Sequence, residues 1–345
     1  MENADSSQAL LSFFGLRRQP FAATVDPVYF YATREHKECL FRLWNSIDER
    51  HGAAVLLGHY GTGKTTLLRK VLTGMRAKPD RYNVAVIGSP VPSWTSFSLL
   101  EGIVTQFGLK PETRSFDAYM ETLHRHLLKH PTRINTLIID DAQHLNKRDQ
   151  LELLRLVQDL ETPRHTLLNL VCFSQMEWLT ALRAAPDFAQ RVHMSCTLGP
   201  LDLAETRGLI DFRLRQAGAA GGLAPVFDDG AVKTIHAYAQ GSPRETVTLC
   251  RNALFLAAQI RTRQLGQDVI LHTIQRTTLP DTERRSRVSA ALEGAAQAAA
   301  PDAPPEPASA PRPAPPRAHS VLQRRANDVL LNTEDTRRSI VKPEP

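Results

Sequence analysis

A glycine-rich segment at residues 58–66 has the residue types and spacing with which a polypeptide backbone binds phosphate groups. It reads Gly-His-Tyr-Gly-Thr-Gly-Lys-Thr-Thr and matches the pattern G-x-x-x-x-G-K-[ST] at every fixed position. Glycines let the backbone curl until successive N–H groups face one concavity, and the start of a following helix adds its own unpaired donors. A chance match is the alternative, but an apolar run before the segment and a helical pattern after it argue against chance. We therefore expect phosphate contacts from seven residues: Gly58, Gly61, Thr62, Gly63, Lys64, Thr65 and Thr66.

Two of these residues predict the identity of the ligand. In such a loop the ammonium group of Lys64 would meet the β- and γ-phosphates, and the hydroxyl of Thr65 would coordinate Mg²⁺. The expected ligands are therefore a nucleotide and Mg²⁺.

A second chemical feature lies about seventy-five residues further on, where the apolar run 134–139 ends in two carboxylates. Ligands of parallel sheets bind beyond the carboxyl ends of the strands, so acidic residues at this point are well placed to act on a nucleotide. Asp140 would hold Mg²⁺ together with Thr65, and Asp141 would polarise the attacking water as a general base, a role worth about 10²–10⁴ in rate. The alternative is that both residues cap a helix.

A third position follows the apolar run 167–173. A polar side chain there would sense the γ-phosphate or hold the attacking water, and we assign this role to Gln175.

The elements around these residues alternate between strands and helices, which predicts an α/β fold. Helices are expected from residue 33, after the loop, at 96–107, from residue 115 and after residue 143. From residue 203 the period is wholly helical, which predicts a small all-helical lid domain. Apolar runs predict strands at 53–57, 84–87, 134–139, 167–173 and 194–198.

Composition changes at both ends of the chain. Residues 1–32 hold aromatics, prolines and a glycine without helical period, so we expect an irregular segment that is either a hydrophobic latch or a border for a nucleotide base. The Ala/Pro-rich stretch cannot form a core and should be a disordered linker. The expected organisation is an N-terminal segment at 1–32, an ATPase core at 33–200, a lid at 201–280, a linker at 281–320 and a tail at 321–345 that could form a short helix.

Composition is that of a globular protein of 345 residues, with a net charge of +6 and a pI near 9.3. This mild basic charge is compatible with nucleic acid or an acidic partner. Four widely separated cysteines, a polar amino terminus and the absence of any long apolar run lead us to expect a cytoplasmic protein without membrane insertion.

The order of these features resembles an AAA+ ATPase, and more narrowly the ATPase domain of the general secretion pathway protein A (ExeA-like) family. The resemblance covers about residues 11–278 and implies a P-loop NTPase (AAA+) fold, a three-layer α/β/α arrangement around a parallel sheet. The motifs that carry it are Phe14-Gly15-Leu16, Pro20-Phe21, Asp26-Pro27, the loop at 58–66, residues 139–143, Leu160-Glu161-Thr162, Gln190-Arg191 and Gly241-Ser242-Pro243-Arg244.

The resemblance also implies that the bound nucleotide is ATP, and it implies roles for three residues. Gln175 matches the sensor-1 position, and Arg191 resembles an arginine finger that reaches the nucleotide of a neighbouring subunit, which implies oligomers. Arg244 matches sensor 2, a lid arginine that approaches the phosphates. The alternatives are an ordinary surface arginine at 191 and, at 244, an arginine at a helix start that binds Glu245 or solvent.

Three departures from the family bear on function. Asp141 stands where glutamate is usual, which predicts slow hydrolysis, and Phe173-Ser174 stand where Val-Gly is usual. The membrane helix and peptidoglycan-binding domain of the secretion proteins have no counterpart in the sequence. Because the ATPase domain also resembles soluble ATP-dependent transposition regulators, we expect an assembly switch that acts on DNA with a transposase or recombination partner. The alternatives are a secretion or envelope-assembly accessory, and an ATP-binding scaffold that barely hydrolyses.

Overall fold

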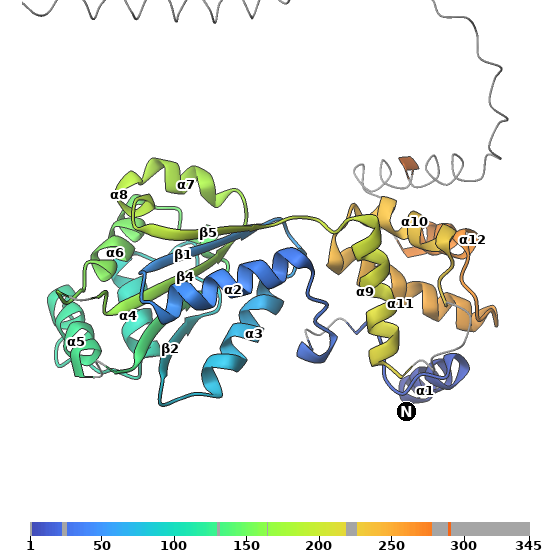
Figure 1. The fold of residues 1–345 in the computed structure, drawn as a ribbon, viewed down its shortest axis with the longest axis horizontal. Helices are drawn as coiled ribbons and strands as arrows, with labels where there is room; N and C mark the ends of the chain where they lie inside the picture. The colour runs from blue at the N-terminus through green and yellow to red at the C-terminus, as the bar shows by residue number, and fades with distance from the viewer. Residues whose placement is uncertain are drawn as a thin grey trace, which may run out of the picture. The chain divides into compact units, whose positions relative to one another are not determined.

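The computed structural model describes residues 2–22, 26–129, 132–163, 165–218, 226–277 and 289–290. Within these residues, five parallel strands form one sheet in the order β2-β3-β4-β1-β5 (Figure 1). Because all strand pairs are parallel, the carboxyl ends of the strands lie at one edge of the sheet, where ligands of such sheets bind. The strands are β1 Ala53–Gly58, β2 Tyr82–Ile87, β3 Ile134–Ile139, β4 Leu168–Ser174 and β5 Val192–Leu198.

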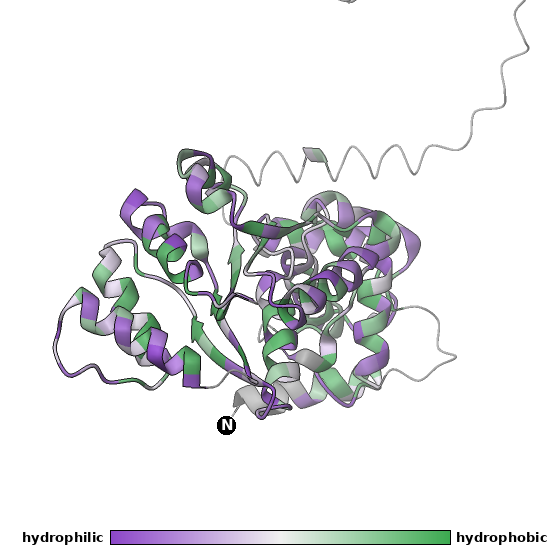
Figure 2. Cartoon of the chain, turned by 60° about the vertical axis from the view of Figure 1, so that its left-hand side comes forward, coloured by the Kyte–Doolittle hydropathy of each residue, from purple (hydrophilic) through white to green (hydrophobic). Residues whose placement is uncertain are grey.

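The helices are amphipathic, and Figure 2 shows hydrophobic and hydrophilic residues alternating along them. Side chains of the residues preceding four helices, Thr33, Asp202, Asp228 and Ser242, accept hydrogen bonds from the first turn and so define the helix starts. The helices are α1 Glu2–Phe14, α2 Arg34–Asp48, α3 Lys64–Arg76, α4 Ser96–Gln106, α5 Phe116–Lys129, α6 Arg148–Gln158, α7 Trp178–Ala184, α8 Pro186–Ala189, α9 Leu203–Gln216, α10 Asp229–Ala239, α11 Pro243–Gln259 and α12 Gln267–Thr277, with 3₁₀ turns η1 Pro27–Tyr29 and η2 Ala142–His144.

Helices cover both faces of the sheet, which explains why β1, β3 and β4 are buried along their whole length. On one face, Val55 and Leu57 of β1 pack in a cluster with side chains of α4, α5 and α6. On the other face, Ala54 and Leu56 pack with side chains of α2 and α3. The expected three-layer arrangement is therefore confirmed.

The expected lid is a separate hydrophobic cluster built from α9, α10, α11 and α12. The turn between α10 and α11 lies against the segment that follows β5, since the Leu201 N–H donates to the Gly241 carbonyl at 2.8 Å. Gly241 has φ 73, and a Cβ at this position would overlap the Leu201 carbonyl oxygen. Only glycine therefore allows this close approach.

The N-terminal segment differs from the irregular one expected for residues 1–32, because Glu2–Phe14 form helix α1. Leu10 and Phe14, four residues apart, are buried in the lid cluster, so burial on the lid explains a helix that the aromatic-rich composition concealed. Phe21 is also in this cluster and contacts Phe227 edge-on, with ring centroids 6.0 Å apart. These aromatics act as a hydrophobic latch, and they pack on the lid.

Two expected features lie outside the described residues. They are the Ala/Pro-rich linker at 281–320 apart from residues 289 and 290, and the tail at 321–345.

Candidate functional site

The glycine-rich loop joins β1 to α3 in a tight turn. Gly61 has φ 82 and Gly63 has φ 100, both in the left-handed region that glycine adopts without strain. A Cβ at Gly58 would lie 2.7 Å from Thr62 Oγ1 and 3.0 Å from the Leu198 carbonyl oxygen. Three of the expected phosphate-binding residues are therefore glycines for steric reasons. Thr65 and Thr66 follow in the first turn of α3.

Lys64 is buried, and its ammonium group binds the backbone at the start of the loop. Nζ donates to the carbonyl oxygens of Gly58 at 2.7 Å and His59 at 2.8 Å. Burial lowers the pKa of Lys64, and the negative charges of Asp140, Asp141 and Glu177 oppose this shift. The lysine is thus held at the loop by neutral acceptors, and a phosphate would supply the counter-charge that the carbonyls lack.

Thr65 and Asp140 meet at the carboxyl edge of the sheet, where the Thr65 hydroxyl donates to Asp140 Oδ2 at 3.2 Å. Burial raises the pKa of Asp140, as does the neighbouring charge of Asp141, while hydrogen bonds from the Asp141 N–H and Thr65 lower it. A hydroxyl and a carboxylate oxygen are hard oxygen ligands of the kind that Mg²⁺ prefers. The donor set therefore fits the expected metal.

Asp141 follows in a left-handed backbone conformation, φ 52, which aspartate tolerates better than most residues. Its Oδ1 accepts a hydrogen bond from Gln143 Nε2 at 3.0 Å. The carbonyl oxygen of the same Gln143 side chain accepts the Gln175 N–H at 3.1 Å and the Ser174 hydroxyl at 3.3 Å. Gln143 thus connects the expected general base to the end of β4, where Gln175 is half-buried.

Arg191 lies away from these residues. It precedes β5, and Val192 pairs with Ala53 at the opposite end of β1 from the loop. Its guanidinium forms an ion pair with Asp159, with Nη2 and Oδ1 2.5 Å apart, and its side chain is 40% exposed. The structure therefore does not bring Arg191 to the phosphate loop of its own subunit.

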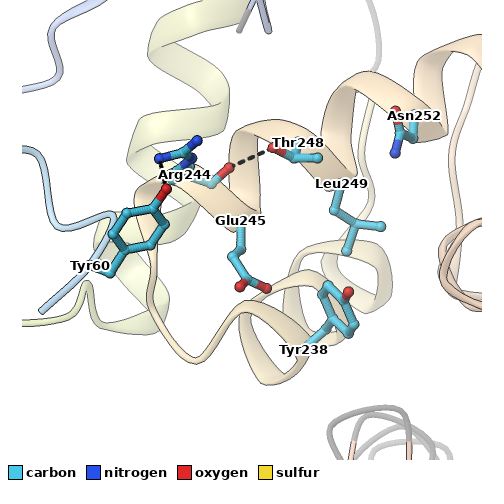
Figure 3. A pocket seen from close by; sticks show the side chains of 7 residues that line it. All are labelled: Tyr60, Tyr238, Arg244, Glu245, Thr248, Leu249 and Asn252. Carbon is cyan, nitrogen blue, oxygen red and sulfur yellow. Dashed lines mark hydrogen bonds between the residues drawn. The ribbon is translucent and has the colours of Figure 1, made fainter. Parts of the chain in front are cut away.

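Arg244 lies beside the loop, as expected for a lid residue that approaches the phosphates. Figure 3 shows its guanidinium against Tyr60, the third residue of the loop. Nη1 donates to the Tyr60 hydroxyl, and Cζ lies 4.6 Å from the ring centroid. The two side chains line a pocket together with Tyr238, Glu245, Thr248, Leu249 and Asn252.

His36, from α2, supports the loop from below. It is buried, its Nδ1 lies 2.6 Å from the Thr33 hydroxyl, and its Nε2 lies 3.0 Å from where a Cβ of Gly63 would be. Burial lowers the pKa of His36, and a hydrogen bond with the Thr62 backbone and the charge of Glu35 oppose this shift. A neutral histidine thus stabilises the turn.

This histidine predicts that stability falls in mild acid. Because the folded-state pKa of His36 is lower than its ordinary 6.5, the unfolded chain binds the proton more readily, and unfolding becomes easier as pH falls below about 6.5. Thermal unfolding measured between about pH 5 and 7.5 should show this loss, and His36→Gln should reduce it. Burial also lowers the pKa of His236, so part of the slope should remain. An identical pH dependence in the variant would contradict the assignment.

Four residues near the site had no role in the sequence-based prediction. They are His36, Tyr60, Gln143 and Glu177, and each acts through neighbours that are distant in sequence or through a position between motifs. Gln143 had a detectable signal, because it ends the motif at residues 139–143 that carries the family resemblance.

Comparisons with known proteins agree with this architecture. Residues 47–182 match the family model described as an AAA domain. The chain is 32% identical over 250 residues to general secretion pathway protein A of Aeromonas hydrophila, an alignment that covers 71% of this chain and 44% of that protein. The chain thus spans less than half the length of this relative.

Solved structures share the fold. Cdc6p of Pyrobaculum aerophilum matches with a TM-score of 0.56 and 18% identity, covering 75% of this chain and 73% of that chain. The Aeropyrum pernix ORC1 protein in complex with DNA matches with a TM-score of 0.55 and 20% identity, covering 74% and 68%. At these identities the likeness shows the AAA+ fold alone.

The secretion relative favours the alternative process over the DNA transposition expected from the sequence. None of the helices in the part of the chain that the structure describes has the length and apolarity needed to cross a bilayer.

Proposed function

We propose that this AAA domain protein binds ATP with Mg²⁺ at the loop between β1 and α3, hydrolyses it, and uses the nucleotide state to switch its assembly. One observation carries the proposal. Lys64, Thr65 and Asp140 meet at the carboxyl edge of the sheet, with the lid residue Arg244 beside the same loop.

The roles of the residues follow from their positions. The backbone donors of residues 58–64 and the Lys64 ammonium bind the phosphates, and Thr65 with Asp140 holds Mg²⁺. When bound, the metal supplies positive charge that stabilises the charge developing on the phosphates. Asp141 accepts a proton from the attacking water, and Gln143 orients its carboxylate. Gln175, whose backbone N–H donates to Gln143, senses the γ-phosphate or holds the attacking water.

The switch depends on two arginines, one in the lid and one that acts on a neighbouring subunit. Arg244 belongs to the lid and can report whether phosphates occupy the loop. Arg191 lies at the other end of β1 from the loop of its own subunit and completes the site of a neighbouring subunit. ATP-dependent oligomers follow from these two roles, and sedimentation with and without a non-hydrolysable ATP analogue tests them.

Replacing Lys64 tests nucleotide binding. Lys64→Ala removes a charged hydrogen-bond donor from a buried position, so ATP affinity should fall by about 10- to 100-fold and turnover should fall with it. Isothermal titration with ATP measures the affinity, and thermal unfolding checks that the variant folds. Lys70→Ala, which changes an exposed lysine on the same helix, should bind like the native protein. Native-like affinity in Lys64→Ala would refute the site.

The first candidate process is secretion or envelope assembly, which the name of the secretion relative supports. Support comes from similarity over 71% of this chain to that protein, of which the alignment covers 44%. A membrane-bound partner is part of the proposal. Co-purification with a membrane-bound partner, and lack of DNA affinity, would support it.

DNA is the second candidate partner. The net charge of +6 is compatible with it, and two AAA+ structures of similar fold are described as bound to DNA, at 20% and 16% identity. Binding to a DNA duplex that requires the ATP analogue and falls steeply with salt would support this candidate over the first. No binding at low salt would exclude it.

A further inference from the structure

We propose that Tyr60 is the positioning residue for Arg244: its ring holds the guanidinium at the phosphate loop before a nucleotide arrives. This inference rests on the proposed function, because it concerns how the lid contributes to nucleotide binding. It assigns a role to a loop position that the phosphate-binding pattern leaves open to any residue.

Tyr60 is placed to do little else within its own subunit. Its side chain is 65% exposed, although tyrosine is a large aromatic residue and lies at the tip of a loop. The Arg244 guanidinium covers the ring, with Cζ 4.6 Å from the centroid, and Nη1 donates to the ring hydroxyl. Arg244 is exposed as well, so the pair orders two side chains that would otherwise move in solvent.

The backbone next to Tyr60 brings the lid to the same place. A Cβ on Gly61 would lie 2.7 Å from Ser242 Oγ and 3.1 Å from Arg244 Cβ, so the start of α11 is in direct contact with the loop. Ser242 caps this helix by accepting the Glu245 N–H. Two consecutive loop residues therefore contact the same turn of the lid, one through its backbone and one through its ring.

The contact prepares Arg244 for a phosphate and does not compete with one. A guanidinium stacks on an aromatic ring with its flat face, whereas it binds phosphate with the N–H groups on its edge. Stacking can therefore persist while the edge donors turn to the ligand. The hydroxyl contact occupies one of these donors, so the ring, and not the hydroxyl, carries the positioning.

This division of labour predicts different results for two variants. Tyr60→Ala removes the ring and should weaken the affinity for an ATP analogue by about two- to fivefold, the range of an exposed cation–π contact. Tyr60→Phe keeps the ring and should bind like the native protein. In steady state, Tyr60→Ala should raise KM by the same factor and leave kcat unchanged, because the loss is one of binding alone.

A double-mutant cycle tests whether Tyr60 acts through Arg244. Affinities for the ATP analogue are measured by titration for the native protein, Tyr60→Ala, Arg244→Ala and the double variant. In the Arg244→Ala background, Tyr60→Ala should have no further effect. Asn252→Ala, which changes another residue of the same pocket, is the matched control and should bind like the native protein.

Each other outcome overturns the inference. Native or tighter binding by Tyr60→Ala would mean that the pair is incidental or competes with the phosphate. An equal loss in Tyr60→Phe would assign the role to the hydroxyl, and an undiminished effect in the Arg244→Ala background would separate the two residues. Failure of the proposed function is distinguishable, because then the native protein itself binds no ATP analogue and Lys64→Ala is indistinguishable from it.

Discussion

Replacing Arg191 with alanine should lower ATP turnover by about 10³-fold or more, while the affinity of a single subunit for ATP stays at the native level. The expected size is that of an arginine finger, which stabilises charge that develops only in the transition state. Binding is spared because Arg191 is not near the loop of its own subunit.

If Arg191 is an arginine finger, the geometry of the sheet requires it to act on the nucleotide of a neighbouring subunit. Val192 pairs with Ala53, and the phosphate loop begins at Gly58, so the two ends of β1 are about 17 Å apart at ~3.3 Å per residue. An arginine side chain cannot cover that distance. In the isolated subunit its guanidinium pairs with Asp159, a contact that a neighbour's phosphates would replace.

Turnover measured against protein concentration checks this prediction. Native activity should rise more steeply than linearly as subunits associate, and Arg191→Ala should remain low at every concentration. Arg183→Ala, an exposed arginine at the end of α7, is the control and should behave like the native protein. If Arg191→Ala hydrolyses ATP at the native rate, Arg191 is an ordinary surface residue.

Asp141→Asn should lower turnover by about 10²–10⁴-fold and leave nucleotide affinity nearly unchanged. An amide has the shape of the carboxylate but cannot accept the proton of the attacking water. Asp141 contacts Gln143 and the start of η2, whereas Lys64, Thr65 and Asp140 make the contacts nearest the loop. Single-turnover kinetics with a separate binding titration distinguish the chemical step from affinity.

Two further variants test whether Asp141 is the general base. Asp141→Glu restores the longer side chain usual in the family that the sequence resembles, and should raise turnover if the short aspartate limits it. Glu177 is exposed and its charge acts on Lys64, so it is the other carboxylate that could serve as base. Retained activity in Asp141→Asn together with loss in Glu177→Gln would transfer the role to Glu177.

Mixing the two inactive variants tests both assignments together. An Arg191→Ala subunit has an intact site, and an Asp141→Asn subunit has an intact finger. If the site is shared, some interfaces in the mixture combine both intact parts, and turnover should recover to a fraction of the native value. No recovery, in a mixture shown by sedimentation to associate, would exclude a shared site.

Much of the fold followed from the sequence, because the signals concerned are local. The apolar runs that became β1, β3 and β4 could be identified because strands buried on both faces are apolar throughout. The phosphate loop was equally readable, since its glycines meet a backbone requirement within nine residues. The lid helices were marked by the helical period of the sequence. Asp140 could be placed beside Thr65 because parallel strands bring their carboxyl ends to one edge.

Other features depended on contacts that local sequence does not encode. Helix α1 was not predicted because its apolar side chains can be recognised as one buried face only when the lid that covers them is known.

Results

Sequence analysis

A glycine-rich segment at residues 58–66 has the residue types and spacing with which a polypeptide backbone binds phosphate groups. It reads Gly-His-Tyr-Gly-Thr-Gly-Lys-Thr-Thr and matches the pattern G-x-x-x-x-G-K-[ST] at every fixed position. Glycines let the backbone curl until successive N–H groups face one concavity, and the start of a following helix adds its own unpaired donors. A chance match is the alternative, but an apolar run before the segment and a helical pattern after it argue against chance. We therefore expect phosphate contacts from seven residues: Gly58, Gly61, Thr62, Gly63, Lys64, Thr65 and Thr66.

Two of these residues predict the identity of the ligand. In such a loop the ammonium group of Lys64 would meet the β- and γ-phosphates, and the hydroxyl of Thr65 would coordinate Mg²⁺. The expected ligands are therefore a nucleotide and Mg²⁺.

A second chemical feature lies further along the chain, where the apolar run 134–139 ends in two carboxylates. Ligands of parallel sheets bind beyond the carboxyl ends of the strands, so acidic residues at this point are well placed to act on a nucleotide. Asp140 would hold Mg²⁺ together with Thr65, and Asp141 would polarise the attacking water as a general base, a role worth about 10²–10⁴ in rate. The alternative is that both residues cap a helix.

A third position follows the apolar run 167–173. A polar side chain there would sense the γ-phosphate or hold the attacking water, and we assign this role to Gln175.

The elements around these residues alternate between strands and helices, which predicts an α/β fold. Helices are expected from residue 33, after the loop, at 96–107, from residue 115 and after residue 143. From residue 203 the period is wholly helical, which predicts a small all-helical lid domain. Apolar runs predict strands at 53–57, 84–87, 134–139, 167–173 and 194–198.

Composition changes at both ends of the chain. Residues 1–32 hold aromatics, prolines and a glycine without helical period, so we expect an irregular segment that is either a hydrophobic latch or a border for a nucleotide base. The Pro/Ala-rich stretch near the other end cannot form a core and should be a disordered linker. The expected organisation is an N-terminal segment at 1–32, an ATPase core at 33–200, a lid at 201–280, a linker at 281–320 and a tail at 321–345 that could form a short helix.

Composition is that of a globular protein of 345 residues, with a net charge of +6 and a pI near 9.3. This mild basic charge is compatible with nucleic acid or an acidic partner. Four widely separated cysteines, a polar amino terminus and the absence of any long apolar run lead us to expect a cytoplasmic protein without membrane insertion.

The order of these features resembles an AAA+ ATPase, and more narrowly the ATPase domain of the general secretion pathway protein A (ExeA-like) family. The resemblance covers about residues 11–278 and implies a P-loop NTPase (AAA+) fold, a three-layer α/β/α arrangement around a parallel sheet. The motifs that carry it are Phe14-Gly15-Leu16, Pro20-Phe21, Asp26-Pro27, the loop at 58–66, residues 139–143, Leu160-Glu161-Thr162, Gln190-Arg191 and Gly241-Ser242-Pro243-Arg244.

The resemblance also implies that the bound nucleotide is ATP, and it implies roles for three residues. Gln175 matches the sensor-1 position, and Arg191 resembles an arginine finger that reaches the nucleotide of a neighbouring subunit, which implies oligomers. Arg244 matches sensor 2, a lid arginine that approaches the phosphates. The alternatives are an ordinary surface arginine at 191 and, at 244, an arginine at a helix start that binds Glu245 or solvent.

Three departures from the family bear on function. Asp141 stands where glutamate is usual, which predicts slow hydrolysis, and Phe173-Ser174 stand where Val-Gly is usual. The membrane helix and peptidoglycan-binding domain of the secretion proteins have no counterpart in the sequence. Because the ATPase domain also resembles soluble ATP-dependent transposition regulators, we expect an assembly switch that acts on DNA with a transposase or recombination partner. The alternatives are a secretion or envelope-assembly accessory, and an ATP-binding scaffold that barely hydrolyses.

Overall fold

The computed structural model describes residues 2–22, 26–129, 132–163, 165–218, 226–277 and 289–290. Within these residues, five parallel strands form one sheet in the order β2-β3-β4-β1-β5 (Figure 1). Because all strand pairs are parallel, the carboxyl ends of the strands lie at one edge of the sheet, where ligands of such sheets bind. The strands are β1 Ala53–Gly58, β2 Tyr82–Ile87, β3 Ile134–Ile139, β4 Leu168–Ser174 and β5 Val192–Leu198.

The helices are amphipathic, and Figure 2 shows hydrophobic and hydrophilic residues alternating along them. The side chains of Thr33, Asp202, Asp228 and Ser242 accept hydrogen bonds from the first turns of the helices that they precede, and so define where those helices start. The helices are α1 Glu2–Phe14, α2 Arg34–Asp48, α3 Lys64–Arg76, α4 Ser96–Gln106, α5 Phe116–Lys129, α6 Arg148–Gln158, α7 Trp178–Ala184, α8 Pro186–Ala189, α9 Leu203–Gln216, α10 Asp229–Ala239, α11 Pro243–Gln259 and α12 Gln267–Thr277, with 3₁₀ turns η1 Pro27–Tyr29 and η2 Ala142–His144.

Helices cover both faces of the sheet, which explains why β1, β3 and β4 are buried along their whole length. On one face, Val55 and Leu57 of β1 pack in a cluster with side chains of α4, α5 and α6. On the other face, Ala54 and Leu56 pack with side chains of α2 and α3. The expected three-layer arrangement is therefore confirmed.

The expected lid has its own hydrophobic cluster, built from α9, α10, α11 and α12. The turn between α10 and α11 lies against the segment that follows β5, since the Leu201 N–H donates to the Gly241 carbonyl at 2.8 Å. Gly241 has φ 73, and a Cβ at this position would overlap the Leu201 carbonyl oxygen. Only glycine therefore allows this close approach.

The N-terminal segment differs from the irregular one expected for residues 1–32, because Glu2–Phe14 form helix α1. Leu10 and Phe14, four residues apart, are buried in the lid cluster, so packing on the lid explains a helix that the aromatic-rich composition concealed. Phe21 belongs to the same cluster and contacts Phe227 edge-on, with ring centroids 6.0 Å apart. This packing agrees with the latch interpretation, and the surface that these aromatics cover is the lid.

Two expected features lie outside the described residues. They are the linker at 281–320 apart from residues 289 and 290, and the tail at 321–345.

Candidate functional site

The glycine-rich loop joins β1 to α3 in a tight turn. Gly61 has φ 82 and Gly63 has φ 100, both in the left-handed region that glycine adopts without strain. A Cβ at Gly58 would lie 2.7 Å from Thr62 Oγ1, and the Thr62 hydroxyl itself donates to the His59 carbonyl at 2.9 Å. The loop therefore needs its glycines for steric reasons. The remaining expected phosphate-binding residues, Lys64, Thr65 and Thr66, form the start of α3.

Lys64 is buried, and its ammonium group binds the backbone at the start of the loop. Nζ donates to the carbonyl oxygens of Gly58 at 2.7 Å and His59 at 2.8 Å. Burial lowers the pKa of Lys64, and the negative charges of Asp140, Asp141 and Glu177 oppose this shift. Neutral acceptors thus hold the lysine at the loop, and a phosphate would supply the stronger, charged partner.

Thr65 and Asp140 meet at the carboxyl edge of the sheet, where the Thr65 hydroxyl donates to Asp140 Oδ2 at 3.2 Å. Burial raises the pKa of Asp140, as does the neighbouring charge of Asp141, while hydrogen bonds from the Asp141 N–H and Thr65 lower it. A hydroxyl and a carboxylate are hard oxygen ligands of the kind that Mg²⁺ prefers. The donor set therefore fits the expected metal.

Asp141 follows in a left-handed backbone conformation, φ 52, which aspartate tolerates better than most residues. Its Oδ1 accepts a hydrogen bond from Gln143 Nε2 at 3.0 Å. The side-chain oxygen of the same Gln143 accepts the Gln175 N–H at 3.1 Å and the Ser174 hydroxyl at 3.3 Å. Gln143 thus connects Asp141 to the end of β4, where Gln175 is half-buried.

Arg191 lies away from these residues. It precedes β5, and Val192 pairs with Ala53 at the opposite end of β1 from the loop. Its guanidinium forms an ion pair with Asp159, with Nη2 and Oδ1 2.5 Å apart, and its side chain is 40% exposed. The structure therefore does not bring Arg191 to the phosphate loop of its own subunit.

Arg244, in the first turn of α11, lies beside the loop. Figure 3 shows its guanidinium against Tyr60, the third residue of the loop. Nη1 donates to the Tyr60 hydroxyl, and Cζ lies 4.6 Å from the ring centroid. The two side chains line a pocket together with Tyr238, Glu245, Thr248, Leu249 and Asn252.

His36, from α2, supports the loop. It is buried, its Nδ1 lies 2.6 Å from the Thr33 hydroxyl, and its Nε2 lies 3.0 Å from where a Cβ of Gly63 would be. Burial lowers the pKa of His36, and a hydrogen bond with the Thr62 backbone and the charge of Glu35 oppose this shift. The folded turn therefore favours the neutral form of His36 over the protonated form.

This histidine predicts that stability falls in mild acid. Because the folded-state pKa of His36 is lower than its ordinary 6.5, the unfolded chain binds the proton more readily, and unfolding becomes easier as pH falls below 6.5. Thermal unfolding measured between about pH 5 and 7.5 should show this loss, and His36→Gln should reduce it. Burial also lowers the pKa of His236, so part of the slope should remain. An identical pH dependence in the variant would contradict the assignment.

Four residues near the site carried no role in the sequence-based prediction: His36, Tyr60, Gln143 and Glu177. Most of them act on partners that are distant in the sequence, so no local pattern identifies them. Gln143 had a detectable signal, because it ends the motif at residues 139–143 that carries the family resemblance.

Comparisons with known proteins agree with this architecture. Residues 47–182 match the family model described as an AAA domain. The chain is 32% identical over 250 residues to general secretion pathway protein A of Aeromonas hydrophila, an alignment that covers 71% of this chain and 44% of that protein. The chain thus spans less than half the length of this relative.

Solved structures share the fold. Cdc6p of Pyrobaculum aerophilum matches with a TM-score of 0.56 and 18% identity, covering 75% of this chain and 73% of that chain. The Aeropyrum pernix ORC1 protein in complex with DNA matches with a TM-score of 0.55 and 20% identity, covering 74% and 68%. At these identities the likeness shows the AAA+ fold alone.

The secretion relative favours the alternative process over the DNA transposition expected from the sequence. None of the helices in the part of the chain that the structure describes has the length and apolarity needed to cross a bilayer.

Proposed function

We propose that this AAA domain protein binds ATP with Mg²⁺ at the loop between β1 and α3, hydrolyses it, and uses the nucleotide state to switch its assembly. One observation carries the proposal. Lys64, Thr65 and Asp140 meet at the carboxyl edge of the sheet, with the lid residue Arg244 beside the same loop.

The roles of the residues follow from their positions. The backbone donors of the loop and the Lys64 ammonium bind the phosphates, and Thr65 with Asp140 holds Mg²⁺. When bound, the metal supplies positive charge that stabilises the charge developing on the phosphates. Asp141 accepts a proton from the attacking water, and Gln143 orients its carboxylate. Gln175, whose backbone N–H donates to Gln143, senses the γ-phosphate or holds the attacking water.

The switch depends on two arginines, one in the lid and one that acts on a neighbouring subunit. Arg244 belongs to the lid and can report whether phosphates occupy the loop. Arg191 lies at the other end of β1 from the loop of its own subunit and completes the site of a neighbouring subunit. ATP-dependent oligomers follow from the second role, and sedimentation with and without a non-hydrolysable ATP analogue tests for them.

Replacing Lys64 tests nucleotide binding. Lys64→Ala removes a charged hydrogen-bond donor from a buried position, so ATP affinity should fall by about 10- to 100-fold and turnover should fall with it. Isothermal titration with ATP measures the affinity, and thermal unfolding checks that the variant folds. Lys70→Ala, which changes an exposed lysine on the same helix, should bind like the native protein. Native-like affinity in Lys64→Ala would refute the site.

The first candidate process is secretion or envelope assembly, which the name of the secretion relative supports. Support comes from similarity over 71% of this chain to that protein, of which the alignment covers 44%. A membrane-bound partner is part of the proposal. Co-purification with a membrane-bound partner, together with a lack of DNA affinity, would support this process.

DNA is the second candidate partner. The net charge of +6 is compatible with it, and two AAA+ structures of similar fold are described as bound to DNA, at 20% and 16% identity. Binding to a DNA duplex that requires the ATP analogue and weakens steeply with salt would support this candidate over the first. No binding at low salt would exclude it.

A further inference from the structure

We propose that Tyr60 is the positioning residue for Arg244: its ring holds the guanidinium at the phosphate loop before a nucleotide arrives. This inference rests on the proposed function, because it concerns how the lid contributes to nucleotide binding. It assigns a role to a loop position that the phosphate-binding pattern leaves open to any residue.

The side chains of Tyr60 and Arg244 make two interactions, a cation–π contact and a hydrogen bond. Tyr60 is 65% exposed, although tyrosine is a large aromatic residue and lies in a tight loop. The Arg244 guanidinium covers its ring, with Cζ 4.6 Å from the centroid, and Nη1 donates to the ring hydroxyl. Arg244 is exposed as well, so the pair orders two side chains that would otherwise move in solvent.

The backbone next to Tyr60 brings the lid to the same place. A Cβ on Gly61 would lie 2.7 Å from Ser242 Oγ and 3.1 Å from Arg244 Cβ, so the start of α11 is in direct contact with the loop. Ser242 caps this helix by accepting the Glu245 N–H. Two consecutive loop residues therefore contact the same turn of the lid, one through its backbone and one through its ring.

The contact prepares Arg244 for a phosphate and does not compete with one. A guanidinium stacks on an aromatic ring with its flat face, whereas it binds phosphate with the N–H groups on its edge. Stacking can therefore persist while the edge donors bind the ligand. The hydroxyl contact occupies one of these donors, so the ring, and not the hydroxyl, carries the positioning.

This difference between ring and hydroxyl predicts different results for two variants. Tyr60→Ala removes the ring and should weaken the affinity for an ATP analogue by about two- to fivefold, the range of an exposed cation–π contact. Tyr60→Phe keeps the ring and should bind like the native protein. In steady state, Tyr60→Ala should raise KM by the same factor and leave kcat unchanged, because the loss is one of binding alone.

A double-mutant cycle tests whether Tyr60 acts through Arg244. Affinities for the ATP analogue are measured by titration for the native protein, Tyr60→Ala, Arg244→Ala and the double variant. In the Arg244→Ala background, Tyr60→Ala should have no further effect. Asn252→Ala, which changes another residue of the same pocket, is the matched control and should bind like the native protein.

The other outcomes overturn the inference. Native or tighter binding by Tyr60→Ala would mean that the pair is incidental or competes with the phosphate. An equal loss in Tyr60→Phe would assign the role to the hydroxyl, and an undiminished effect in the Arg244→Ala background would separate the two residues. Failure of the proposed function is distinguishable, because then the native protein binds the ATP analogue no better than Lys64→Ala does.

Discussion

Replacing Arg191 with alanine should lower ATP turnover by about 10³-fold or more, while the affinity of a single subunit for ATP stays at the native level. The expected size is that of an arginine finger, which stabilises charge that develops only in the transition state. Binding is spared because Arg191 is not near the loop of its own subunit.

If Arg191 is an arginine finger, the geometry of the sheet requires it to act on the nucleotide of a neighbouring subunit. Val192 pairs with Ala53, and the phosphate loop begins at Gly58, so the two ends of β1 are about 17 Å apart at ~3.3 Å per residue. An arginine side chain cannot cover that distance. In the single subunit its guanidinium pairs with Asp159, a contact that a neighbour's phosphates would replace.

Turnover measured against protein concentration checks this prediction. Native activity should rise more steeply than linearly as subunits associate, and Arg191→Ala should remain low at every concentration. Arg183→Ala, which changes an exposed arginine at the end of α7, is the control and should behave like the native protein. If Arg191→Ala hydrolyses ATP at the native rate, Arg191 is an ordinary surface residue.

Asp141→Asn should lower turnover by about 10²–10⁴-fold and leave nucleotide affinity nearly unchanged. An amide has the shape of the carboxylate but cannot accept the proton of the attacking water. The side chain of Asp141 bonds to Gln143, whereas the contacts at the loop are made by Lys64, Thr65 and Asp140. Single-turnover kinetics with a separate binding titration distinguish the chemical step from affinity.

Two further variants test whether Asp141 is the general base. Asp141→Glu installs the longer side chain usual in the family that the sequence resembles, and should raise turnover if the short aspartate limits it. Glu177 is exposed and its charge acts on Lys64, so it is another carboxylate that could serve as base. Retained activity in Asp141→Asn together with loss in Glu177→Gln would transfer the role to Glu177.

Mixing the two inactive variants tests both assignments together. An Arg191→Ala subunit has an intact site, and an Asp141→Asn subunit has an intact finger. If the site is shared, some interfaces in the mixture combine both intact parts, and turnover should recover to a fraction of the native value. No recovery, in a mixture shown by sedimentation to associate, would exclude a shared site.

Much of the fold could be predicted because the signals concerned are local. The apolar runs that form β1, β3 and β4 were identifiable, since strands buried on both faces are apolar throughout. The phosphate loop was equally clear, because its glycines meet a backbone requirement within a few residues. The lid helices were marked by the helical period of the sequence. Parallel strands bring their carboxyl ends to one edge, which is why Asp140 could be placed beside Thr65.

Other features depended on contacts that the local sequence does not encode. Helix α1 was not predicted because its apolar side chains can be recognised as one buried face only when the lid that covers them is known. The bond from Gln175 to Gln143 spans 32 positions, and the contact of Arg244 with Tyr60 spans 184.

The sequence by itself thus determined the strands, most of the helices, the phosphate loop and the edge of the sheet where the carboxylates lie. Only the tertiary structure decided that Arg191 lies at the opposite end of β1 from its own loop, that Gln143 connects Asp141 to β4, and that Tyr60 contacts Arg244 of the lid. The physical reason is that backbone conformation responds to neighbours along the chain, whereas the partner of a side chain is set by which distant segments the fold brings together.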